Sequence, residues 1–169
     1  MKKVLAASAI LVFFLSSCLK NDKTCNYEDS KVVAPEAEIA KLTDSLAAHG
    51  ITDATFHPSG FYYTINNPGT GNAITNLCSE ITVQYSGKLF NGNVFDATQQ
   101  GASAYFQLGG VITGWQKGIA LVKAGGSITL YIPPSLAYGS QEIRDQNTGA
   151  IIIPANSNLI FEVGVEAIR

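Results

Sequence analysis

Apolar residues at helical spacing mark the first predicted element of the chain. Ile39, Leu42 and Leu46 recur every three to four positions, so they share one face of a helix. Proline in the first turn, early acidic residues and a glycine after the last turn are the usual start and stop signals. The pattern predicts one amphipathic helix over residues 35–49, followed by a connector to residue 58. This helix either packs on the domain or spaces it from a membrane.

From residue 61 on, apolar and polar residues alternate instead, which is the spacing of half-buried β-strands. Ile81, Val83 and Tyr85, for example, share one face of such a strand. Strands are predicted at 61–65, 81–85, around 95, and at 105–108, 128–132 and 159–165. With a short helix at 115–122, they predict an α+β domain, a curved antiparallel sheet wrapped around one short central helix, plus the extra N-terminal helix.

The stretch Val111–Gly118 leads into the predicted central helix and contains Trp115, the only tryptophan of the chain. A lone tryptophan is either a core residue or the surface of a pocket. Aromatic residues of several predicted elements accompany it, namely Tyr85, Phe95, Phe106, Tyr138 and Phe161. If they share an inner face, they form an apolar pocket in which Asp96 and the Tyr138 hydroxyl are the few polar groups. A plain hydrophobic core is the alternative.

The first residues have the composition of an export signal. Lys2 and Lys3 precede an apolar run that ends in Ser-Ser-Cys18, and this run is too short for a membrane-spanning helix. The pattern resembles a bacterial lipoprotein signal, with residues 1–17 removed and Cys18 lipidated. Residues 18–34 are polar and form a predicted tether. Leucine rather than aspartate at position 19 favours the outer membrane, so we expect a lipid-anchored protein of the bacterial cell envelope.

Removal of that signal leaves 152 of the 169 residues, which is the size of one domain. Lys plus Arg falls from 11 to 9 against 13 acidic residues, a net charge near −4, which argues against a nucleic-acid partner. Cys25 and Cys78 remain. In an oxidising compartment they either form a disulfide, which would attach the tail to the start of the strand at 81–85, or stay unpaired.

Motifs for several kinds of chemistry are missing. Gly69-Thr-Gly71 has neither the third glycine of a dinucleotide loop nor the lysine of a phosphate loop. His49 and His57 have no partner at metal-ligand spacing, and no serine or cysteine stands in a nucleophile motif. We therefore expect no cofactor, no metal and no covalent intermediate.

Seven short motifs, in order, resemble the FK506-binding-protein (FKBP) family of peptidyl-prolyl cis-trans isomerases. They are Val83-Gln-Tyr-Ser-Gly87, Asn93-Val-Phe-Asp96, Phe106-Gln-Leu-Gly109, Val111-Ile-Thr-Gly-Trp115, Ala137-Tyr-Gly139, Ile152-Ile-Pro154 and Leu159-Ile-Phe-Glu-Val163. The resemblance covers about residues 61–168, within an isomerase domain predicted at 59–169. Each motif is weak alone, but all seven in the family's order are specific.

The resemblance implies a role for each pocket residue. Trp115 would be the floor under a proline ring, Tyr138 and the backbone N–H of Ile112 would bind substrate carbonyls, and Asp96 would engage Tyr85 or the ligand. The walls would come from aromatic and aliphatic side chains. The implied catalytic set is Tyr85, Phe95, Asp96, Trp115 and Tyr138, and the implied substrate-binding set is Phe106, Val111, Ile112, Ile153 and Phe161.

The implied activity is rotation about Xaa-Pro bonds of exported polypeptides, with macrolides of the FK506 and rapamycin type as further ligands. We expect a monomer, because the helix at 35–49 is too short for a dimerisation arm. Two departures support an alternative, a catalytically weak binding or chaperone module. An aromatic residue of the family is Ala104 here, and the loop at 140–150 is longer than in compact members.

Overall fold

The computed structural model describes residues 25–169, so the predicted signal peptide, Cys18 and the first part of the predicted tether lie outside the described residues. The helices are α1 (Glu36–Ala48) and α2 (Thr113–Ile119), with 3₁₀ turns η1 (Leu108–Gly110) and η2 (Pro134–Leu136). The strands are β1 (Thr55–His57), β2 (Phe61–Asn67), β3 (Glu80–Leu89), β4 (Val94–Ala97), β5 (Ala104–Gln107), β6 (Gly126–Ile132), β7 (Ile143–Arg144), β8 (Ile151–Ile153) and β9 (Leu159–Ile168).

One antiparallel sheet carries the domain. Its strand order is β1-β2-β6-β9-β3-β4, and β5 pairs with β3 beside β4. The long strands β3 and β9 pair from Ile81↔Ile168 to Leu89↔Leu159 and form the centre of the sheet. Several of their inward side chains are fully buried, among them Ile81, Val83 and Leu159. The predicted fold class is confirmed, because alternation along these strands reports one buried face.

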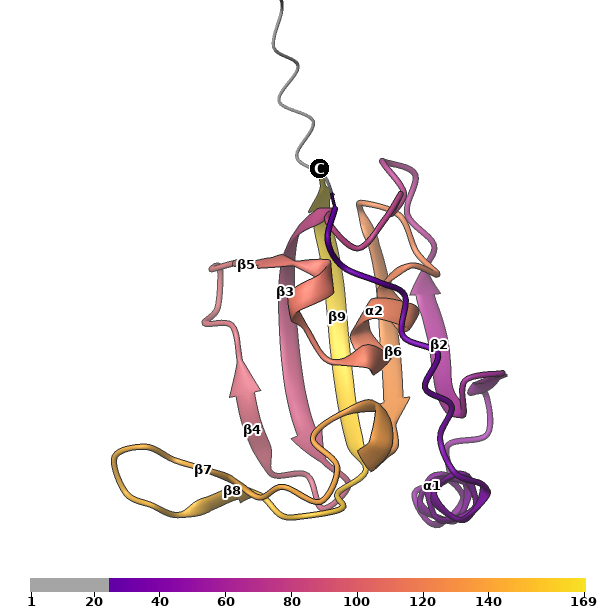
Figure 1. Ribbon diagram of the computed structural model, residues 1–169, viewed down its shortest axis with the longest axis vertical. Helices are drawn as coiled ribbons and strands as arrows, with labels where there is room; N and C mark the ends of the chain where they lie inside the picture. Colours follow the sequence, from indigo (N-terminus) through magenta and orange to yellow (C-terminus); the bar gives the residue numbers. More distant parts are fainter. Residues whose placement is uncertain (1–24) are drawn as a thin grey trace, which may run out of the picture.

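Helix α2 lies across one face of this sheet (Figure 1) and meets it through two glycines one turn apart. A Cβ atom at Gly114 would lie 2.6 Å from the Ile132 side chain of β6, and one at Gly118 would overlap Leu130 of the same strand. The absence of these side chains lets the helix backbone sit directly on β6. This close approach fixes the height of Trp115 above the sheet.

The central helix was predicted at 115–122, and those bounds are wrong. It begins two residues earlier and ends at Ile119, after which Leu121 and Val122 continue in a turn whose N–H groups bond to Gly118 and Ile119. Val122 is buried in that turn. Buried apolar residues in the turn after a helix thus continue the helical sequence pattern, which led to a predicted end that is too late.

Helix α1 packs on the domain, which decides between the two expectations for it. Leu42 and Leu46 are buried against Tyr131 and Ile160 in a small second cluster. Glu38 adds a polar contact, because its Oε2 accepts a hydrogen bond of 2.9 Å from the backbone N–H of Ser135. No helix within residues 25–169 is long and apolar enough to cross a membrane.

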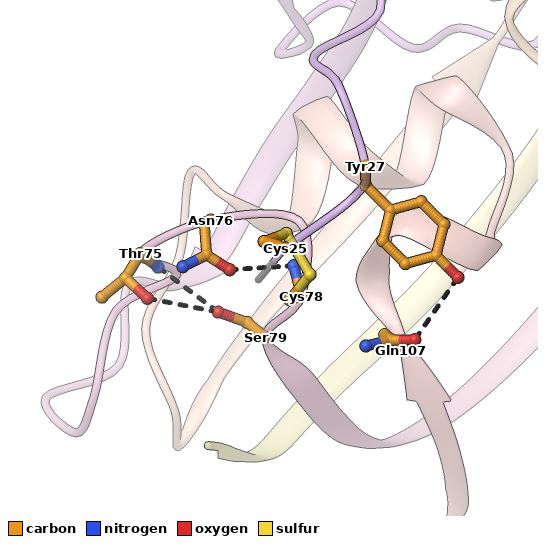
Figure 2. Close-up of a disulfide and its surroundings, with 7 residues drawn as sticks. All are labelled: Cys25, Tyr27, Thr75, Asn76, Cys78, Ser79 and Gln107. Carbon is orange, nitrogen blue, oxygen red and sulfur yellow. Dashed lines mark hydrogen bonds between the residues drawn. A yellow bond between two sulfur atoms is a disulfide. The ribbon is translucent and has the colours of Figure 1, made fainter. Parts of the chain in front are cut away.

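The described part of the predicted tether, residues 25–34, lies along the domain on the face that carries α2 (Figure 1). Cys25 and Cys78 form a disulfide with a Cα–Cα distance of 5.6 Å, just before β3 (Figure 2). Further along, Lys117 Nζ donates to the Ser30 carbonyl (2.7 Å) and Ala34 is buried. From Cys25 on, this segment is attached to the folded body.

The long loop at 140–150 forms a hairpin that the sequence analysis did not predict. Strands β7 and β8 pair at Ile143↔Ile153 and Arg144↔Ile151. Asp145 closes the tip by accepting hydrogen bonds from Asn147 and Thr148, and Arg144 bonds to Glu142. The hairpin extends from the end of the molecule opposite the C-terminus (Figure 1).

Candidate active site

A cavity of about 280 Å³ opens between α2, η1 and the neighbouring strands. Its lining joins residues from seven elements or their ends, namely Tyr85, Asp96, Phe106, Gly110, Val111, Ile112, Trp115, Tyr138 and Phe161. Eight of these nine were predicted as site residues from the sequence. The antiparallel sheet brings them together, since β3, β4, β5 and β9 are adjacent strands.

The indole of Trp115 forms the base of the cavity, and three aromatic rings stand almost perpendicular to it. Ring centroids lie 5.2 Å away for Tyr85, 5.8 Å for Phe106 and 5.3 Å for Phe161, with interplanar angles of 85–88°. Edge-to-face contacts of this kind add to the packing energy of aromatic pairs. The four rings make a rigid apolar floor with three walls.

Trp115 is 4% exposed, yet it borders the opening beside Tyr138. Its indole N–H is buried without a hydrogen-bond partner among the described residues. Buried polar atoms without a partner are uncommon in folded proteins and cost free energy. Because Trp115 lines an open cavity, it is not part of a sealed core.

Asp96 and Tyr85 form the polar edge of the cavity. The Tyr85 hydroxyl donates a hydrogen bond of 2.6 Å to Asp96 Oδ2, which was one of the two partners expected for Asp96. Burial, this hydrogen bond and the Asp96 charge raise the pKa of Tyr85 above its usual value. Tyr85 thus stays protonated and keeps the carboxylate at the edge.

Two residues that line the cavity have a hydrogen-bond donor without a partner in residues 25–169. Tyr138 follows η2, and burial and the Asp96 charge raise the pKa of its hydroxyl. Ile112 precedes α2, and its backbone N–H makes no intramolecular hydrogen bond in this part of the chain. A polar acceptor entering the cavity therefore meets one O–H and one N–H group.

Phe95 and Ile153 do not line the cavity, contrary to expectation. Phe95 lies behind the wall, where its ring packs edge-on against Phe161 at 5.5 Å and 82°. The absence of a side chain at Gly87 leaves room for this pair. Ile153 is 3% exposed in β8 and belongs to the core. Phe95 therefore supports the Phe161 wall from behind, whereas Ile153 is part of the main core.

Gly110 is a lining residue that the sequence analysis missed. The Gly109-Gly110 pair directly before Val111 was the available signal, because consecutive glycines often mark a close backbone approach. Within residues 25–169 no three potential metal-ligating side chains gather, and no serine, threonine, cysteine, lysine or histidine lines the cavity. The cavity therefore offers a ligand an apolar surface and a few hydrogen-bond donors.

Comparison with known proteins agrees with this geometry. A family model described as FKBP-type peptidyl-prolyl cis-trans isomerase matches residues 72–166, more than half of the chain. The chain belongs to the FKBP-type peptidyl-prolyl cis-trans isomerases. The family predicted from the seven motifs is confirmed, and all nine residues that line the cavity fall within the matched range.

Individual FKBP relatives extend the similarity beyond the matched domain. The FKBP-type isomerase FkpA of Buchnera aphidicola (subsp. Baizongia pistaciae) is 38% identical over 86% of this chain and 56% of its own length. The outer membrane protein MIP of Legionella longbeachae is 37% identical over 66% of this chain and 46% of its own. The crystal structure of FkpA from Escherichia coli has a TM-score of 0.65 at 32% identity, covering 79% of this chain and 60% of that one.

The FkpA relatives from Buchnera aphidicola are longer proteins, and this chain spans 39–56% of their length. What is shared is the FKBP domain and, in the widest match, much of the segment before it.

Proposed function

We propose that this chain is an active peptidyl-prolyl isomerase that accelerates rotation about Xaa-Pro bonds in exported polypeptides. One observation carries the proposal: the indole floor with three perpendicular ring walls, open beside Tyr138. A proline ring is compact and apolar, so it fits this shape. Membership of the FKBP family supports the same activity.

The reaction needs no nucleophile. The barrier to rotation, about 18–20 kcal/mol, comes from the partial double bond between the carbonyl carbon and the proline nitrogen. The twisted amide has lost that resonance and is less polar than the planar one. A water-poor aromatic cavity therefore favours the twisted state relative to the ground state.

The donors of the cavity orient the substrate during rotation. With the proline ring held on Trp115, the Tyr138 hydroxyl and the Ile112 N–H bind carbonyl groups on either side of the bond that turns. Asp96, held by Tyr85 at 2.6 Å, sits at the edge where the carbonyl swings. These groups position and stabilise, and no proton is transferred.

The envelope location follows from the N-terminal residues. A signal over residues 1–17 and lipidation of Cys18 would anchor the domain to a membrane, and the outer membrane is the proposed one. One relative is named an outer membrane protein, which supports this location. The proposed partners are proline-containing exported chains and macrolides of the FK506 type, and the protein acts as a monomer.

A protease-free isomerisation assay on a Xaa-Pro peptide tests the activity. Tyr138→Phe removes one hydroxyl and no packing, so kcat/KM should fall about 2- to 10-fold, the equivalent of one hydrogen bond. Tyr105→Phe, in an exposed tyrosine outside the cavity, is the matched control and should keep the wild-type rate. No turnover by the wild type would contradict the function, and an undiminished rate in Tyr138→Phe would contradict the role of Tyr138. An FK506-type macrolide should inhibit the wild type.

A further inference from the structure

We propose that Tyr27, which lies outside the matched family domain, is a positioning residue for the wall of the proline pocket. The proposal rests on the proposed isomerase function and extends it to the N-terminal segment. Tyr27 follows Cys25 by two residues, so the Cys25–Cys78 disulfide fixes where its ring lies (Figure 2).

The ring of Tyr27 covers Gly109 of η1. A Cβ atom at Gly109 would overlap the ring itself, so the aromatic face rests directly on the glycine backbone. At the edge of η1, the Tyr27 hydroxyl donates to Gln107 Oε1 at 3.3 Å. Any side chain at position 109 would displace the tyrosine.

The segment that contains Cys78 holds η1 from its other side. The N–H of Gly109 donates to the Leu77 carbonyl at 2.7 Å, and the N–H of Leu108 donates to the Ser79 carbonyl at 3.0 Å. Cys78 lies between these two acceptors in the sequence. The backbone N–H of Cys78 donates a hydrogen bond of 2.8 Å to Asn76 Oδ1. The disulfide therefore closes a ring of contacts around η1, with Tyr27 on one side and residues 77–79 on the other.

From η1 the contacts continue into the pocket. Gly110 and Val111, the next residues, line the cavity. The Gln116 side-chain amide donates to the carbonyls of both Gly109 (3.2 Å) and Val111 (2.8 Å). Since Gln116 follows Trp115 in α2, a shift of Gly109 displaces the wall and the helix that carries the floor.

The segment makes a second contact with α2 that fixes its course. Lys117 Nζ donates to the Ser30 carbonyl at 2.7 Å. Tyr27 is thus held at both ends of a short span, by the disulfide before it and by Lys117 after it. Because the segment is attached on both sides of Tyr27, the ring limits the movement of Gly109 in η1.

Tyr27→Ala in the full-length protein, purified in detergent, tests the role. We expect KM for a Xaa-Pro peptide to rise roughly 3- to 10-fold with kcat changed less than about 2-fold, because a displaced wall weakens substrate binding. The emission of Trp115, the only tryptophan, should shift in the same variant. Tyr27→Phe keeps the ring on Gly109 and should restore both readouts.

Two further variants make the test specific. Tyr105→Ala removes another exposed tyrosine, on β5, and should leave KM and emission unchanged. In the Cys25→Ser/Cys78→Ser protein, adding Tyr27→Ala should change KM less than it does in the wild type, because both act through one set of contacts. Full additivity, or a Tyr27→Ala protein with a lower melting temperature but wild-type KM and emission, overturns the proposal.

Failure of the positioning role differs from failure of the isomerase function. If the wild type has no turnover, proline-peptide affinity is measured through Trp115 emission, and Tyr27→Ala should weaken it by a similar factor. If the wild type turns over and Tyr27→Ala matches it, the isomerase function stands and the role of Tyr27 is refuted.

Discussion

Two tyrosine hydroxyls share the neighbourhood of a single carboxylate, and their protonation decides what the pocket can donate. Burial and the Asp96 charge both disfavour the phenolate of Tyr85 and of Tyr138, so both pKa values lie above the usual 10.0. Each hydroxyl remains a donor over the range in which an ordinary tyrosine starts to ionise.

A pH profile of isomerisation should reflect these raised pKa values. We expect the alkaline decline of kcat/KM to be centred above about pH 10, because the pKa of both hydroxyls lies above that of an ordinary tyrosine. Asp96→Asn removes the charge, which lowers the pKa of both hydroxyls toward 10.0 and brings the alkaline decline to lower pH. A decline centred below about pH 9 in the wild type would contradict the assignment.

His57 makes stability depend on pH on the acid side. Its ring stacks on Phe61 at 4.3 Å, and burial and then the Lys117 charge lower its pKa below 6.5. The unfolded chain therefore binds the proton first as pH falls, and the free energy of unfolding decreases from about pH 6.5 down through the folded-state pKa. Urea midpoints between about pH 7.5 and pH 5.5 measure this decrease. The urea midpoint of His57→Gln should decrease less over this pH range. An equal decrease in the variant and the wild type would show that His57 is not the cause.

At the scale of elements, the contact between α2 and β6 sets the pocket depth. Gly114→Ala places a methyl group 2.6 Å from Ile132, in a core that cannot yield cheaply. Overpacking of this kind costs about 1–3 kcal/mol and outweighs the better helix propensity of alanine. We expect a lower urea midpoint and a lower kcat/KM, because the helix moves with Trp115.

Gly164→Ala in β9 is the matched control for this change. Its Cβ would lie 3.8 Å from the Gln84 carbonyl, an ordinary contact. Stability and rate should change little there. Equal losses in the two alanine variants would show that glycine removal in general, and not the helix contact, is responsible.

The elements differ in how well the sequence predicts them, and the reason is what each packs against. Alternation located β2, β3, β6 and β9, because an apolar face of each packs into the main core. The three-residue strand β1 is too short to show a pattern. The hairpin β7–β8 is held by its own turn and by side-chain contacts such as Arg144 with Glu142. Its turn is therefore polar, and its sequence has no alternating apolar pattern that would predict strands.

The candidate site divides in the same way. Its aromatic and polar residues follow from the family motifs, which preserve the chemistry at each position. Phe95 and Ile153 were misplaced because a motif residue beside a pocket and one behind its wall look alike in sequence. Gly110 had a local signal in the Gly109-Gly110 pair, whereas Tyr27 depends on a contact between distant segments that no local pattern reports.

At the scale of the whole molecule, the disulfide links residues 53 positions apart. Closing a loop of this length restricts the unfolded chain and adds about 2–5 kcal/mol to the free energy of unfolding. Reduction with a thiol reagent should lower the urea midpoint of the wild type accordingly. The Cys25→Ser/Cys78→Ser protein should have the lower urea midpoint from the start, and the reagent should not change it. An unchanged midpoint of the wild type after reduction would contradict this contribution.

The described chain begins and ends at one extremity of the body. Arg169 and Glu80 exchange backbone hydrogen bonds of 2.8 and 2.9 Å, two residues from the cysteine that holds Cys25. The hairpin β7–β8 projects from the opposite extremity (Figure 1). A lipid anchor on Cys18, as proposed above, would therefore join the domain at the extremity opposite the hairpin.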